Sequence, residues 1–114
     1  MKDFMFLFRG GLDFAKATPE QIQEAMQNWR AWSEKLTQEG RFGGGNRLVK
    51  EGAVISGKKK NLLDGPFTEG KEIVGGFISI KARDLAHAIE TAQSCPTFNH
   101  DGIIEIREII PVHN

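Results

Sequence analysis

The sequence predicts an α+β fold in which two helices cover one face of an antiparallel sheet. Two observations support this prediction. Two segments have apolar residues at helical spacing, and the segments around them alternate as strands do. The expected order is strand, helix, strand or hairpin, strand, helix, strand, which is the ferredoxin-like, split-βαβ arrangement. A chain of 114 residues also suits one domain spanning 1–114.

The first two elements are defined by their end signals. The apolar run Phe4–Phe8 predicts a strand with both faces covered. Thr18-Pro19-Glu20-Gln21 predicts a helix start, with Thr18 as the cap and Gln21 completing a capping box. An apolar stripe follows at steps of three and four residues, formed by Ile22, Ala25, Met26, Trp29, Trp32 and Leu36. Gly40 predicts the helix end.

The middle of the chain gives weaker signals. The glycines of 41–46 predict a loop, and Leu48–Ser56 has a weak strand pattern. Residues 57–61 read as a turn, and Leu62-Leu63 as a short return strand. The clearest strand is Ile73–Ala82, where alternation places Val74, Ile78 and Ile80 opposite Phe77, Ser79 and Lys81.

The last two elements leave one sheet face without a cover. Asp84 caps a second helix that Pro96 ends, and its apolar stripe is Leu85, Ala88, Ile89 and Ala92. The final strand, 102–110, turns Ile103, Glu105, Arg107 and Ile109 to the face without helices. Together with Phe77 and part of the first strand, that face is too apolar for water, so we expect a two-fold homodimer that buries it.

Composition excludes several partners. Fifteen acidic and fifteen basic residues give no net field toward nucleic acid or an anionic membrane, and the run Lys58–Lys60 reads as a solvated turn. The single cysteine, Cys95, fits a reducing compartment. No apolar run is long enough to span a membrane, and Met1–Arg9 lacks a signal-peptide pattern, so we expect a cytoplasmic protein. His87, His100, His113 and Cys95 do not have metal-ligand spacing, so no metal site is expected.

Asp64 is the main candidate for a functional residue. A turn aspartate usually accepts a hydrogen bond from the backbone N–H two residues on, but that residue is Pro66, which has none. Asp64 must therefore use a later N–H, a distant donor, water or a ligand. Both interpretations remain open: a turn-stabilising residue, or a carboxylate presented to a site.

The segment around Asp64 also carries a resemblance. "LLDGPFTEGKEIVGGF" resembles the DGPF motif of the YCII-related family, through Asp64, Gly65, Pro66, Phe67, Glu69, Lys71, Glu72, Gly75, Gly76 and Phe77. "EGRF" after the first helix, "DLAHAIETA" and the closing "IIEIREIIPV" fit as well. The resemblance implies a dimeric α+β barrel. It also implies an acid/base pair of histidine and aspartate, and for the DGPF subgroup a gene-context link to sigma factors.

One departure affects the implied chemistry. The family's histidine lies eleven residues before the glycine of the Glu-Gly-Arg turn, which is Trp29 when counted from Gly40. An indole donates one hydrogen bond and does not titrate, so the acid/base pair is absent in that form. Trp29 also lies on the buried stripe of its helix, which favours a core role.

Two hypotheses follow. In the first, the dimer encloses a small-molecule site without a cofactor. Asp64 is its acid/base residue or anchor, and Arg107 binds an anionic group. The site is lined by Trp29, Trp32, Phe67, Phe77 and Glu72. Glu105 and Arg107 could equally form a structural salt bridge. In the second, the protein is a non-catalytic regulator or interaction partner of the transcription machinery.

Overall fold

The computed structural model describes residues 1–66 and 73–112. The elements, in chain order, are β1 (Lys2–Gly10), α1 (Pro19–Gln38), β2 (Phe42–Arg47), β3 (Ala53–Ser56), β4 (Asn61–Asp64), β5 (Val74–Ala82), α2 (Leu85–Gln93), the 3₁₀ helix η2 (Pro96–His100) and β6 (Gly102–Glu108). No helix among the described residues is long and apolar enough to cross a membrane.

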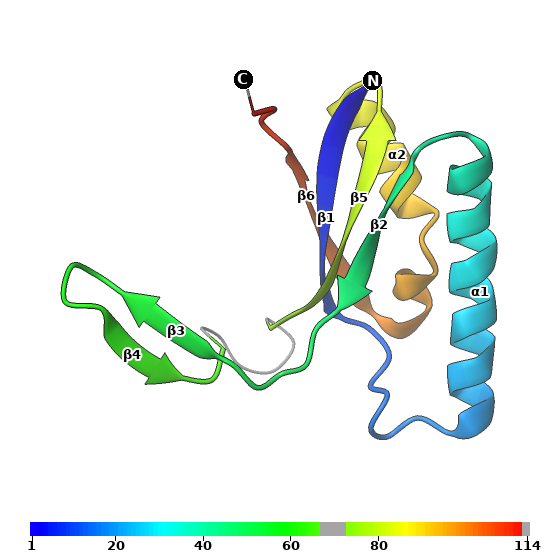
Figure 1. The fold of residues 1–114 in the computed structure, drawn as a ribbon. Coiled ribbons are helices and arrows are strands. Elements are labelled where there is room, and N and C mark those ends of the chain that lie inside the picture. The colour runs from blue at the N-terminus through cyan, green and yellow to red at the C-terminus, as the bar shows by residue number, and fades with distance from the viewer. Residues whose placement is uncertain (67–72, 113–114) are drawn as a thin grey trace.

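Four of the strands form one antiparallel sheet in the order β2-β5-β1-β6. Strand β5 lies between β1 and β2, and β1 lies between β5 and β6, so each helix connects two strands that are split by a third. Both α1 and α2 lie on the same side of this sheet (Figure 1). The predicted ferredoxin-like α+β fold is confirmed.

The core lies between the sheet and the two helices. Phe4 pairs with Ile80 and Phe6 with Ile78 across β1 and β5, and Phe4, Phe6 and Ile80 are wholly buried. Fully burying side chains of this size stabilises the fold by about 1.5–3 kcal/mol each. Trp32 and Leu36 of α1 and Ala88 and Ala92 of α2 complete the cluster from the helix side.

Helix α1 begins as its sequence predicts. The Thr18 hydroxyl accepts a hydrogen bond from the Gln21 backbone N–H at 3.1 Å, and the Gln21 side-chain oxygen accepts one from the Thr18 N–H at 2.9 Å. This reciprocal capping box satisfies two N–H groups that the first turn of a helix leaves without partners.

The predicted loop over 41–46 is wrong, because most of it forms the edge strand β2. Glycine usually has a low strand propensity, because it has no side chain to pack against neighbouring strands. In β2 the missing side chain instead allows the two backbones to lie close together. A Cβ on Gly45 would lie 2.0 Å from the carbonyl oxygen of Phe77, so no larger residue fits there unless β2 moves away from β5. Gly44, at a φ of +89°, lies where the register shifts between Phe42 and Gly45.

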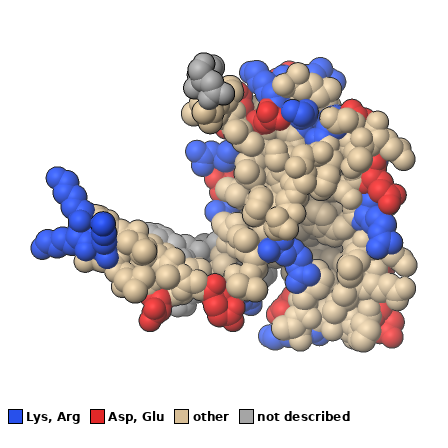
Figure 2. All heavy atoms as spheres, viewed as in Figure 1, with Lys and Arg blue, Asp and Glu red and all other residues tan. Residues whose placement is uncertain are grey.

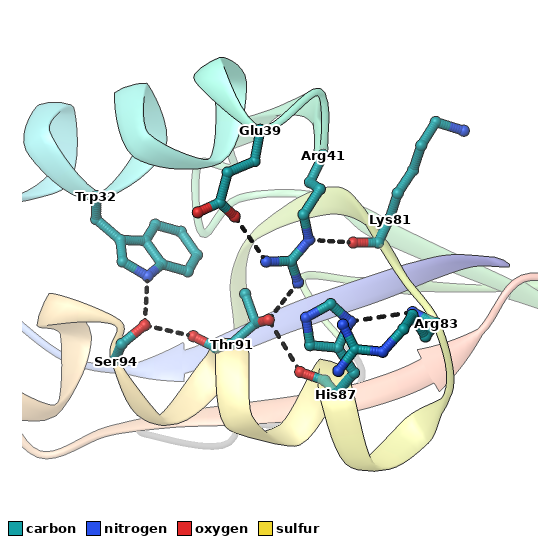
Figure 3. Close-up of polar contacts among 8 residues, drawn as sticks. All are labelled: Trp32, Glu39, Arg41, Lys81, Arg83, His87, Thr91 and Ser94. Carbon is teal, nitrogen blue, oxygen red and sulfur yellow. Dashed lines mark hydrogen bonds and ion pairs between the residues drawn. The ribbon is translucent and has the colours of Figure 1, made fainter. Parts of the chain in front are cut away.

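A buried arginine joins the two helices to the sheet (Figure 3). The Arg41 guanidinium donates to the Lys81 carbonyl at 2.8 Å, to the Glu39 carboxylate at 2.9 Å and to the Thr91 hydroxyl. Beside it, the Trp32 indole N–H donates to Ser94 of the α2 C-terminus at 3.0 Å. Because each of its three side-chain nitrogens donates a hydrogen bond, Arg41 has a structural role between α1, β5 and α2.

The remaining strands, β3 and β4, form a separate two-stranded sheet. We call residues 53–64 the arm. It projects from the end of the main sheet, on the side away from α1 (Figure 1). The weak strand predicted over Leu48–Ser56 is therefore shorter than expected and belongs to the arm, and β2 takes the place expected for it in the main sheet.

Candidate functional site

The main sheet has one face that no helix covers, which we call the open face. Cross-strand pairing places Leu7 opposite both Phe77 and Glu105, and Met5 opposite both Ser79 and Arg107. The side chains of the open face are Asp3, Met5, Leu7, Arg9, Phe77, Ser79, Lys81, Ile103, Glu105 and Arg107. Apolar and charged side chains thus share one surface, as alternation predicted for Phe77, Lys81, Glu105 and Arg107.

Glu105 is at the centre of a charged cluster on this face. Its carboxylate accepts a hydrogen bond from Arg9 Nη1 at 2.6 Å and one from Arg107 Nη1 at 3.3 Å. The hydrogen bond from Arg9, followed by that from Arg107, holds the pKa of Glu105 below its usual value. The carboxylate is therefore ionised at neutral pH and shared between two guanidinium groups.

The sequence left open a salt bridge between Glu105 and Arg107. The structure contains this pair at 3.3 Å and adds Arg9 to it. Arg9 could have been found by parity, because it follows Met5 and Leu7 at steps of two along β1. A second pair, Lys81 with Asp3 at 2.8 Å, lies on the same face. The Glu105–Arg107 and Lys81–Asp3 pairs are exposed and stabilise the single chain little, so the cluster is of interest for what it can bind.

Asp64 does not lie on the main sheet. It ends β4 on the arm, opposite Ala53, and it is exposed in the single chain. Its carboxylate makes no hydrogen bond or ion pair with another residue in the described ranges. The next residue, Gly65, has a φ of +81° and donates its N–H to the Gly52 carbonyl at 2.6 Å, so the chain turns directly after Asp64.

The other predicted site residues separate into two groups. Phe77 and Arg107 share the open face, whereas Trp29 lies on the helix side, where its ring packs edge-on against Phe8 at 5.2 Å and Trp32 at 5.5 Å. Trp29 thus fits the core role that its place on the stripe favoured. Phe67 and Glu72 lie outside the described residues.

Cys95 has no catalytic setting. Its thiol is buried at the start of η2, and burial raises its pKa to about 12, so it stays protonated and a poor nucleophile at neutral pH. Within residues 1–66 and 73–112, no group of three His, Cys, Asp or Glu side chains is placed to hold a metal ion.

Fold and open face together define a class: a ferredoxin-like α+β protein whose uncovered sheet face carries a charged cluster among apolar side chains. The chain matches the YCII-related domain over residues 5–113, and it belongs to that family. No curated protein matches the chain.

Proposed function

We propose that this YCII-related protein pairs through its open face into a homodimer, a dimeric α+β barrel, and binds a small anionic molecule in the enclosed space. The proposal includes no cofactor, and it places the protein in the cytoplasm, where a free cysteine such as Cys95 stays reduced. The sequence from Asp64 to Phe77 supports membership of the DGPF subgroup within the family.

The observation that carries the proposal is the Arg9–Glu105–Arg107 cluster beside Leu7 and Phe77. An apolar face favours burial against another surface. Charges that become buried must be paired or must line a polar cavity. A dimer that covers this face would therefore contain a polar site with two guanidinium groups and one carboxylate, which suits a carboxylate or phosphate ligand.

Each site residue has a distinct role in the proposal. Arg107 binds the anionic group, and the ring of Phe77 forms an apolar wall on the same face. Asp64 acts as the acid/base residue or as a second anchor. The proposal leaves Trp29 out, because its ring packs on the helix side. Phe67 and Glu72 remain predicted ligand contacts.

Binding of small anions tests this function. The parent protein is screened by native mass spectrometry and thermal shift against small carboxylates and organic phosphates. Arg107→Met should abolish the binding of any hit, and Asp64→Asn should weaken it. Glu34→Gln, on an exposed position of α1, removes one carboxylate elsewhere and should bind as the parent does. Equal binding by the parent and Arg107→Met would contradict the proposal.

A second candidate is a non-catalytic interaction protein linked to transcription. The exposed arm favours it, since Leu62 and Leu63 lie beside a turn that carries Lys58–Lys60. A pull-down with purified sigma factor should then recover a complex with the parent and with Asp64→Asn. The paired change Leu62→Ser and Leu63→Ser should abolish that complex. Retention of it by the arm variant would exclude the arm as the binding surface.

A further inference from the structure

The arm exposes apolar side chains on both of its faces. Ile55 and Leu62 form a cross-strand pair on one face and are 68% and 63% exposed, and Leu63 on the other face is 58% exposed. A two-stranded ribbon without a covering layer is marginally stable in water. These side chains therefore indicate a surface that another body covers.

The arm and the open face border the same corner of the molecule. Figure 1 shows the arm leaving the end of the main sheet on the side opposite α1, which is also the side of the open face. Figure 2 shows the described part of the arm standing apart from the rest of the protein. One body placed in the corner would cover both surfaces.

The arm and the open face carry opposite charges at Asp64 and Arg107. The Arg107 side chain is 70% exposed, and among the described residues its one ion pair is with Glu105 at 3.3 Å, which Arg9 also holds at 2.6 Å. A guanidinium group can bind a further carboxylate with two parallel hydrogen bonds. Asp64 shares its face of the arm with Leu62 and Ile55, and it has no partner in the described part of the chain.

We propose that in the homodimer each arm crosses to the other protomer, where Asp64 lies beside Arg107 of the partner subunit. A two-fold axis repeats the contact, so that one operation covers both arms and both open faces. This inference rests on the dimer and on the role of Asp64 given under the proposed function, and it adds which chain supplies the Asp64 carboxylate. Arg107 has five side-chain N–H donors, so it can hold this carboxylate and still donate to the anionic group of a ligand. Each site is then built from two chains and is incomplete in a monomer.

Cross-linking between singly substituted chains tests the arrangement. Asp64→Cys and Arg107→Cys are made in separate chains that carry different tags, both in a Cys95→Ala background, and the two are coexpressed. A short bis-maleimide is used, because a contact made through the long arginine side chain leaves the Cα atoms too far apart for a disulfide. The expected product is a covalent heterodimer, with little product from either variant alone.

The outcomes separate this inference from the proposed function. A cross-link that forms within one doubly substituted chain, with none between the singly substituted chains, would place Asp64 on its own subunit and overturn the inference. Absence of any cross-link in a protein that sedimentation shows to be dimeric would also overturn it, yet leave the open-face dimer standing. A chain that stays monomeric at all concentrations would contradict both. No ligand is involved, so a failed ligand screen does not affect the result.

Charge reversal gives a second measurement that does not depend on cysteine chemistry. Asp64→Arg and Arg107→Asp should each raise the dimer dissociation constant about tenfold or more, measured by sedimentation. The double variant should recover most of that loss, because the pair is restored with its charges exchanged. Three variants that dimerise like the parent would show that the two side chains do not meet.

Discussion

The helix side of the main sheet and the arm contain the same kinds of apolar residue in opposite surroundings. Phe4 and Phe6 of β1 are wholly buried beneath α1 and α2, whereas Ile55 and Leu62 of the arm are mostly exposed. The buried residues hold the single chain together. Those of the arm contribute little to it, which indicates that they are present for contacts outside the single chain.

The largest expected effect comes from a core truncation compared with an arm truncation. Phe6→Ala should lower the free energy of unfolding by about 3–5 kcal/mol, because it removes buried contacts and leaves a cavity. Leu62→Ala should change the free energy of unfolding of the dilute monomer by no more than about 0.5 kcal/mol. Urea unfolding measures both. A comparable loss in the two variants would show that the arm is part of the monomer core.

A glycine comparison gives the next effect. Gly45→Ala would place a Cβ 2.0 Å from the Phe77 carbonyl oxygen and 2.7 Å from the Ile78 Cα, so β2 must move away from β5. We expect a loss of about 1–3 kcal/mol, the usual range for overpacking. Gly52→Ala, in the connection that leads to the arm, meets nothing within 4 Å and should be nearly neutral. If urea unfolding finds the two variants equally stable, β2 is not held against β5 as described.

The fold was predictable because its signals are local. Alternation along β5 identified Ile78 and Ile80 as facing the helices, and the capping residues at Thr18 and Asp84 marked both helix starts. Strand β2 was missed because its glycines carry no side-chain signal. These glycines form a strand because β5 lies so close to them. Gly45 pairs with Ile78, about thirty residues away in the sequence, so the contact has no local signal.

The site was less predictable for a similar reason. The two-residue alternation of side chains along each strand placed Phe77 and Arg107 on one face, and the same alternation along β1 could have added Arg9. The position of Asp64 depends on the path of the chain between β2 and β5, which leaves the main sheet to form the arm. Neither residue spacing nor a missing turn partner carries that information.

The start of α1 offers a smaller test within the body of the protein. Thr18→Ala removes the hydroxyl that accepts from the Gln21 N–H and should cost about 1 kcal/mol in unfolding free energy. Thr18→Ser keeps the hydroxyl and should behave nearly as the parent. If the Ala and Ser variants unfold alike, the capping box does not stabilise the helix, and packing of Trp32 and Leu36 alone would hold α1 in place.

The smallest effect concerns the charged cluster on the open face. Carboxyl NMR of the dilute monomer should find the Glu105 pKa below its usual value, and Arg9→Met should raise it more than Arg107→Met does, since the Arg9 hydrogen bond is the larger cause. A pKa lowered by folding stabilises the protein above the unfolded value, about 4.3, and that contribution is lost as the pH falls through the folded value. Glu105→Gln should therefore make the free energy of unfolding fall less steeply as the pH is lowered.

The salt dependence of the Glu105 pKa, measured at low and high protein concentration, tests whether the open face becomes covered. In the dilute monomer the cluster is open to water, so added salt should screen the lowered Glu105 pKa toward its usual value. If dimerisation covers the open face, the same titration at high protein concentration should resist salt, because enclosed pairs are screened much less. A salt response that is the same at both concentrations would mean that Glu105 stays in contact with water, and that the open face, unlike the helix side of the sheet, is never covered by a second copy.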